Sequence, residues 1–87
     1  MAYNITFSPD AWADYLYWQT EDKKTLKRIN RLLQELQRDR AARGLGKTEL
    51  LRHTDGMSRR IDDKNRLVYT IKGESLVILS CRGHYEC

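Results

Sequence analysis

The positions of the apolar residues divide the chain into a helical first half and a strand-rich second half. After Asp22, apolar residues recur at the three- and four-residue spacings of an α-helix with one buried face. The residues of this stripe are Leu26, Ile29, Leu32, Leu33 and Leu36. Asp22 is a favoured N-cap residue type, and Gly44 stands where glycine commonly ends a helix. The pattern therefore predicts a helix from Asp22 to about Ala42.

A shorter strand and helix are predicted before it. Residues 3–7 have the composition of a strand. Ser8 is placed to cap a helix whose first turn holds Pro9 and Asp10, both suited to a helix N-terminus. We expect this helix to continue to about Thr20. The side chains expected to face the core are Trp12, Tyr15 and Leu16.

The second half reads as strands separated by turns. The expected strands are 48–52, 58–61, 65–71 and 75–81, with turns at 53–57, 62–64 and 72–74. The segment 76–79 is entirely apolar, which favours an interior strand covered on both faces. There are no repeats and no linkers, so we expect one α+β domain spanning residues 1–87.

Strand alternation separates the arginines of the expected hairpin. Alternate residues of a strand point to opposite faces. The side chains expected to face the helices are Ile61, Leu67, Tyr69 and Ile71. The side chains expected on the open face are Ser58, Arg60, Asp62, Arg66, Val68 and Thr70. Arg60 and Arg66 are thus predicted to share a surface, with Arg59 turned away or near the edge of the sheet.

Charge is distributed unevenly along the chain. The net charge is +4, but residues 1–22 hold four acids and no Lys or Arg. The remainder holds sixteen basic and eight acidic side chains, a net charge of +8. This asymmetry indicates an oriented polyanionic partner, or alternatively a solvated helix face. No apolar segment is long enough to span a bilayer and no signal peptide is visible, so we expect a cytoplasmic protein without membrane contact.

Two segments resemble cofactor-binding motifs, one for a metal and one for a nucleotide, but neither matches a complete motif. Cys81, His84 and Cys87 offer three potential metal ligands, but no matching pair occurs elsewhere, so we predict no metal site. We expect a buried thiol at Cys81 and an exposed one at Cys87. The segment 44–47 contains two glycines and a lysine but does not match a nucleotide-binding loop, so no cofactor is expected.

Several short motifs occur in a characteristic order. They are Trp12-Ala13-Asp14-Tyr15-Leu16-Tyr17-Trp18-Gln19, Lys27-Arg28-Ile29-Asn30, Gly44-Leu45-Gly46-Lys47-Thr48-Glu49, Ser58-Arg59-Arg60-Ile61, Arg66-Leu67-Val68-Tyr69 and His84-Tyr85. With these motifs the chain resembles the YoeB family of RelE/ParE-type toxins from bacterial toxin–antitoxin systems. The resemblance implies a microbial-ribonuclease-like fold with helices packed on a curved antiparallel sheet. It also implies a ribosome-dependent endoribonuclease that cleaves mRNA in the ribosomal A site.

The resemblance assigns roles to individual residues. Glu49 matches the catalytic glutamate and is our general base; the alternative is a surface glutamate paired with Lys47 or Arg52. His84 is our general acid, whereas His53, beside a turn, is expected to have no catalytic role. Arg66 and Arg60 are assigned to the scissile phosphate, with Arg66 stabilising the transition state. Tyr85 is assigned to stacking on a base or to assisting the leaving group. Lys47 and Arg59 are assigned as further RNA contacts.

Some features depart from the family pattern. Thr48 and Leu50 replace the prolines that usually flank the glutamate, and Met57 replaces the usual aromatic residue. Two residues follow Tyr85, where the chain often ends. The aromatic cluster of the first helix is expected to pack in the core rather than form a base-stacking platform.

The resemblance also implies partners and leaves two other functions open. The implied partners are mRNA, the 70S ribosome and a YefM-like antitoxin, and a homodimer is compatible with the family. One alternative is a non-enzymatic toxin of the same fold that acts on DNA gyrase. The other is a basic RNA- or ribosome-binding module.

Overall fold

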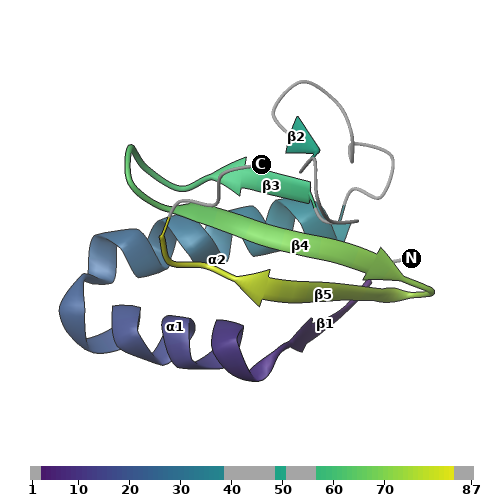
Figure 1. Ribbon diagram of the computed structural model, residues 1–87, viewed down its shortest axis with the longest axis horizontal. Coiled ribbons are helices and arrows are strands. Elements are labelled where there is room, and N and C mark those ends of the chain that lie inside the picture. The colour runs from purple at the N-terminus through teal and green to yellow at the C-terminus, as the bar shows by residue number, and fades with distance from the viewer. Residues whose placement is uncertain (1–2, 39–48, 51–56, 84–87) are drawn as a thin grey trace.

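Two helices lie on one face of a five-stranded mixed sheet (Figure 1). The computed structural model describes residues 3–38, 49–50 and 57–83, with Glu49 and Leu50 described at the backbone. In chain order the elements are β1 (Asn4–Phe7), α1 (Pro9–Glu21), α2 (Lys23–Arg38), β2 (Glu49–Leu50), β3 (Met57–Arg60), β4 (Arg66–Lys72) and β5 (Ser75–Ser80). The predicted α+β class, with two N-terminal helices on a sheet, is therefore confirmed.

The helix starts were read correctly because their signals are local. Ser8 caps α1: its Oγ accepts a hydrogen bond from the backbone N–H of Ala11 at 3.1 Å. Asp22 does the same for α2, accepting from the backbone of Lys24 and Thr25. The hydroxyl and backbone hydrogen bonds from Thr25 hold the pKa of Asp22 below its usual value. The predicted end of α2 near Ala42, with Gly44 beyond it, lies outside the described residues.

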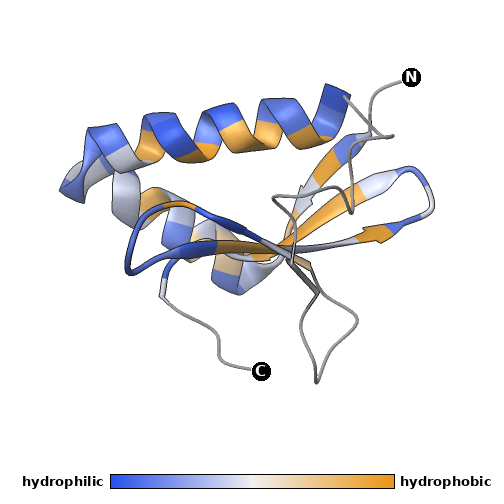
Figure 2. Ribbon diagram, turned by 90° about the horizontal axis from the view of Figure 1, so that it is seen from above, coloured by the Kyte–Doolittle hydropathy of each residue, from blue (hydrophilic) through white to orange (hydrophobic). Residues whose placement is uncertain are grey.

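The apolar stripe of α2 faces the sheet, as its period predicts (Figure 2). Ile29, Leu32, Leu33 and Leu36 are buried, and Leu26 is partly buried against them. They meet Leu67 and Tyr69 from β4 and Leu76 and Ile78 from β5. These residues form the main core of the molecule.

The expected core face of α1 was wrong for Trp12 and Leu16, whereas Tyr15 is partly buried against the core as expected. Trp12 and Leu16 are 49% and 42% exposed, whereas Ala11 and Trp18 are buried. The rotation of the helix is set by Cys81, whose carbonyl oxygen accepts a hydrogen bond from Trp18 Nε1 at 2.9 Å. Cys81 Sγ also contacts the carbonyl oxygen of Ala11. This long-range contact turns Trp12 and Leu16 outward.

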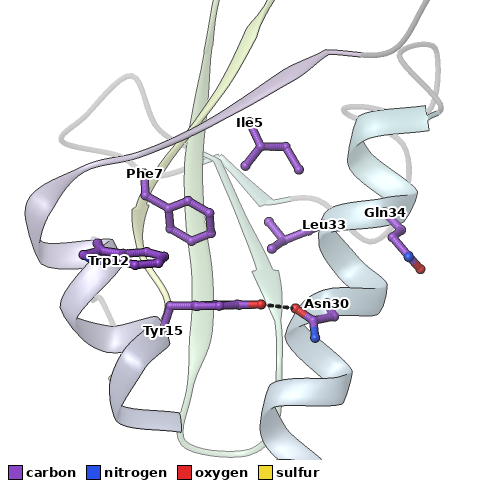
Figure 3. A pocket seen from close by; sticks show the side chains of 7 residues that line it. All are labelled: Ile5, Phe7, Trp12, Tyr15, Asn30, Leu33 and Gln34. Atoms are coloured by element: carbon purple, nitrogen blue, oxygen red, sulfur yellow. Dashed lines mark hydrogen bonds between the residues drawn. The ribbon is translucent and has the colours of Figure 1, made fainter. Parts of the chain in front are cut away.

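The outward-turned Trp12 lines a shallow hollow of mixed polar and apolar character between β1, α1 and α2 (Figure 3). Its ring stacks on Tyr15 and meets Phe7 edge to face. The other lining residues are Ile5, Asn30, Leu33 and Gln34. Tyr15 is fixed there because its hydroxyl donates to Asn30 Oδ1 at 2.7 Å. The prediction of core packing thus holds for Trp18 but only in part for Trp12.

The sheet is mixed rather than antiparallel, which corrects the expectation from the family resemblance. Its strand order is β1-β5-β4-β3-β2, and β1 pairs with β5 in parallel while the other neighbours are antiparallel. Since β1 and β5 are separated by nearly the whole chain, no tight hairpin forces them to be antiparallel.

Strand β5 is interior but not covered equally on both faces, which corrects a second expectation. Leu76 and Ile78 are fully buried, whereas Val77 and Leu79 are only partly buried. A register shift leaves Leu79 as an extra residue between the pairs Tyr69–Ile78 and Val68–Ser80.

The predicted hairpin is present, with β3 and β4 joined by residues 61–65. The turn at Gly73, whose φ of 58° suits glycine, is also present. Met57 belongs to β3 rather than to the preceding turn. Residues 51–56 lie outside the described residues. No helix in the described part of the chain is long and apolar enough to cross a membrane.

Candidate functional site

Arg60 and Arg66 lie directly opposite each other on the hairpin face that points away from the helices, as strand alternation predicts. That face is not open along its whole length, because Ser58 and Val68 on it are buried. Directly opposed residues have Cβ atoms about 4.5–5.5 Å apart. Arg60 is exposed and forms an ion pair with Asp63 in the adjoining turn. Arg66 is partly buried, and its Nε donates to Ser58 Oγ at 3.2 Å. The two arginines therefore stand on one face of the hairpin, with the Arg60 guanidinium directed to Asp63 in the turn and the Arg66 guanidinium directed to Ser58.

Ser58 is a site residue that the sequence reasoning did not single out. It is buried and pairs with Glu49 on one side and with Val68 on the other. Val68 in turn pairs with Ser80, so these four residues form one row across the sheet. The available signal was alternation, which places Ser58 on the same face as Arg60. Ser58 therefore links the backbone position of Glu49 to the guanidinium of Arg66.

The hairpin turn is stiffened by Asp62. Its carboxylate accepts hydrogen bonds from the backbone of Lys64 and Asn65, both at 2.8 Å, and from Asn65 Nδ2. Burial alone would raise its pKa, but these hydrogen bonds outweigh that effect, so the pKa of Asp62 lies below its ordinary value. The carboxylate is therefore charged at neutral pH and holds the turn that joins the two arginine-bearing strands.

The end of β5 is anchored to α1 and to the hairpin. The backbone N–H of Cys81 donates to Asp14 Oδ2 at 3.0 Å, next to the Trp18 contact described above. The carbonyl oxygen of Gly83 accepts from the Arg66 backbone N–H at 3.0 Å. These bonds fix the backbone at the point where the C-terminal tail begins, one residue before His84.

The Cys81 thiol is buried and chemically quiet, as the sequence predicts. Burial, and secondarily the charge of Asp14, raises its pKa to about 12. It is therefore a neutral thiol at physiological pH. The described residues contain no group of three or more metal-ligating side chains.

Arg59 does not belong to the arginine-bearing face. Its side chain is 10% exposed and donates to Glu35 Oε1 on α2 at 2.8 Å. The expectation that Arg59 turns away is confirmed. Its burial and its pairing with Glu35 argue against the expected role as a further RNA contact. Arg59 connects β3 to α2 instead.

The other predicted site residues lie outside what the structure describes. For Glu49 this concerns the side chain, whereas for Lys47, His84 and Tyr85 it concerns the whole residue, as it does for the competing histidine, His53. The described part of the site is thus the pair of arginines, Ser58 and the anchored base of the tail.

Comparison with known proteins places the chain among bacterial toxins. Residues 7–85 match the model for the YoeB-like toxin of bacterial type II toxin–antitoxin systems. Toxin YoeB of Mycobacterium bovis is 45% identical over 84 residues, which cover 94% of this chain and 98% of that protein.

Solved structures agree. The YoeB dimer from Staphylococcus aureus has a TM-score of 0.84 and 47% identity, covering 98% of this chain and 100% of that one. The heterotetrameric YoeB–YefM toxin–antitoxin complex from the same organism has a TM-score of 0.81 and 47% identity, with the same coverage. The similarity therefore extends over nearly the whole chain.

Proposed function

This chain belongs to the YoeB-like toxins of bacterial type II toxin–antitoxin systems, and we propose that it is an endoribonuclease that cleaves mRNA in the A site of the ribosome. The observation that carries the proposal is the opposed pair Arg60 and Arg66 on one face of the hairpin. Guanidinium groups bind phosphate through paired hydrogen bonds, and two of them suit a phosphate that gains negative charge as it reacts.

The two arginines have different parts in the proposed reaction. Arg66 is partly buried and oriented by Ser58, so it is suited to stabilise the transition state with little reorganisation. Arg60 is exposed, and its surface ion pair with Asp63 is worth only about 0–1 kcal/mol. It can therefore exchange Asp63 for an RNA phosphate at small cost.

The acid–base chemistry is assigned to Glu49 and His84. The 2′-hydroxyl attacks the neighbouring phosphorus while Glu49 removes its proton, and His84 protonates the 5′ oxygen as that bond breaks. Glu49 is paired with Ser58 in the same row of the sheet, and His84 follows Gly83, which is hydrogen-bonded to Arg66. The products are a 2′,3′-cyclic phosphate, or the 3′-phosphate formed when it opens, and a 5′-hydroxyl. No metal is required, and Tyr85 is assigned to stacking on a base or to assisting the leaving group.

The proposed partners follow from the family and from charge. The solved relatives include a YoeB–YefM complex and a YoeB dimer, and we extend both kinds of partner to this chain. A flexible acidic segment of the antitoxin that folds on binding would cover the Arg60 and Arg66 face. The ribosome as substrate carrier implies action in the cytoplasm.

The test is a purified translation system with primer extension on the message. Wild-type protein should produce discrete 5′ ends within the A-site codon of stalled ribosomes, and Arg66→Ala protein at equal concentration should not. Ribosome binding without new ends would favour a binding module. In a parallel test in cells, growth arrest with intact messages and inhibited gyrase would favour the non-enzymatic alternative. Either result would overturn the proposal.

A further inference from the structure

Gly83 is held on both of its backbone polar groups by two consecutive residues of the hairpin. Its N–H donates to Asn65 Oδ1 at 2.8 Å, and its carbonyl oxygen accepts from the Arg66 N–H at 3.0 Å. Residues 65 and 83 are exposed or partly so, and neither bond is part of a strand ladder. Gly83 is thus clamped to Asn65, at the end of the hairpin turn, and to Arg66, the first residue of β4.

The Asn65 amide is itself oriented by Asp62. Its Nδ2 donates to both carboxylate oxygens of Asp62, at 3.0 and 3.1 Å. With Nδ2 committed to a carboxylate, only the amide oxygen is left to accept from Gly83, so the orientation of the amide is determined by its partners. Asp62 is in turn held by the backbone of the turn. A continuous chain of hydrogen bonds therefore runs from the hairpin turn to Gly83.

The backbone at Gly83 has a conformation that other residues rarely adopt. Its φ is +92°, and a Cβ there would meet no atom of the described residues within 4 Å, so the constraint that these residues impose is conformational rather than steric. The preceding Arg82 lies over the Tyr17 ring, with Cζ 3.7 Å from the ring centre. The bend at Gly83, the Arg82 contact and the Asn65 clamp together hold the backbone of residues 82 and 83 in place.

We propose that Asn65 is a positioning residue for His84, which it controls by fixing Gly83 beside Arg66. This inference rests on the catalytic role of His84 proposed above. Consecutive Cα atoms are about 3.8 Å apart, so His84 begins within one peptide of the clamp. Because a displacement of about 1 Å in a reacting group can cost about 100-fold in rate, a hydrogen bond at this point has a large effect on proton transfer.

The first test is Asn65→Ala in single-turnover cleavage of ribosome-bound message. The variant should lower the cleavage rate constant about 10- to 100-fold while ribosome affinity changes less than about twofold, because only proton transfer is misaligned. Lys64→Ala, in the same exposed turn and without a side-chain hydrogen bond in the described structure, is the matched control and should cleave at the wild-type rate.

A double-mutant cycle separates positioning of His84 from a general structural role. If Asn65 acts through His84, then Asn65→Ala should have little further effect in a His84→Ala background. Independent, multiplicative losses would overturn the proposal. An inactive wild type would instead refute the proposed ribonuclease function, so the two failures are distinguishable.

A swap of the two side chains tests the hydrogen bonds themselves. Asn65→Asp alone places two carboxylates together and should be as impaired as Asn65→Ala. In Asp62→Asn/Asn65→Asp, position 62 supplies the amide donor and the backbone acceptor, and position 65 supplies the acceptor for the Gly83 N–H. Cleavage should return to within about threefold of wild type. Failure of this variant to recover, with an unfolding midpoint equal to that of the wild type, would overturn the proposal.

Discussion

Replacing the two adjacent arginines of β3 with alanine should affect different properties of the protein. Arg59→Ala gives the more specific prediction, because it concerns stability. Arg59 is buried against α2 and paired with Glu35, whereas Arg60 is exposed on the other face of the sheet. Arg59→Ala should therefore lower stability and leave cleavage by the folded protein nearly unchanged. Arg60→Ala should leave stability nearly unchanged and lower cleavage.

The size of the stability loss follows from the exposure of the two partners. Removing one partner of a fully buried pair costs about 3–5 kcal/mol, and a surface pair contributes about 0–1 kcal/mol. The Arg59 side chain is 10% exposed but that of Glu35 is 40% exposed, so the Glu35 carboxylate can be hydrated when Arg59 is removed. We expect a loss of about 2 kcal/mol, between these limits, which lowers the melting temperature of a domain this size by roughly 8–16 °C.

Urea unfolding followed by tryptophan fluorescence measures the first effect, since Trp18 is buried in the core. Glu35→Ala and the double variant complete a thermodynamic cycle, in which the double variant should lose less than the sum of the two single losses. Cleavage rates are compared at a temperature where every variant is folded. Arg59→Ala should remain within about threefold of wild type, whereas Arg60→Ala should lose about 10- to 100-fold, the usual value of a charge-assisted hydrogen bond. An unchanged unfolding midpoint for Arg59→Ala, or equal losses of cleavage at both positions, would refute the assigned faces.

Three further predictions concern chemistry and the buried side chains. Glu49→Gln and His84→Ala should each slow single-turnover cleavage by roughly two to four decades. Arg66→Ala should lower the cleavage rate far more than it lowers ribosome affinity. Cleavage at the wild-type rate by any of these variants would remove that residue from the mechanism. Ser80 Oγ is a buried hydroxyl without a hydrogen-bond partner in the described structure. Ser80→Ala should therefore raise the free energy of unfolding, measured by urea titration, by about 1 kcal/mol. A free energy of unfolding below that of the wild type would indicate that the hydroxyl has a partner. The pKa of Cys81 is raised from 9.0 to about 12, so the contribution of its neutral thiol to stability is complete below about pH 9 and is lost as pH rises toward 12. Cys81→Ala should therefore weaken the pH dependence of the urea midpoint between about pH 9 and 12. An unaltered dependence would contradict the assigned burial.

Local signals accounted for the elements of the fold. The caps at Ser8 and Asp22, the apolar stripe of α2 and the alternation of the hairpin all depend on residues close in sequence. Each of these features could therefore be predicted from the sequence alone. Alternation also placed Arg60 and Arg66 on a common face, which is the main described feature of the site.

Contacts between distant residues accounted for the errors. Both sides of α1 carry aromatic residues, and its rotation depends on the hydrogen bond from Trp18 to Cys81, 63 positions away. Strand alternation showed that Arg59 turns away from the Arg60 and Arg66 face. It did not show that Arg59 forms an ion pair with Glu35 on α2. The parallel pairing of β1 likewise depends on a strand at the other end of the chain.

The predicted roles of individual residues came from the family resemblance more than from the pattern. Glu49 and His84 are single residues without a periodic or spacing signal, and only their position within family motifs marked them. Ser58 lies in a family motif but received no role from it, and Asn65 lies outside the motifs, because the importance of both lies in hydrogen bonds to Arg66 and Gly83. Side-chain geometry was therefore needed to find them.

The most direct test of the account is a message with a single 2′-deoxynucleotide on the 5′ side of the cleaved bond in the A-site codon. The proposed reaction uses that 2′-hydroxyl as the nucleophile, so the modified message should remain intact on the ribosome while an all-ribose message is cut to a 5′-hydroxyl end. Cleavage of both messages at the same bond and rate would contradict the mechanism assigned to this protein.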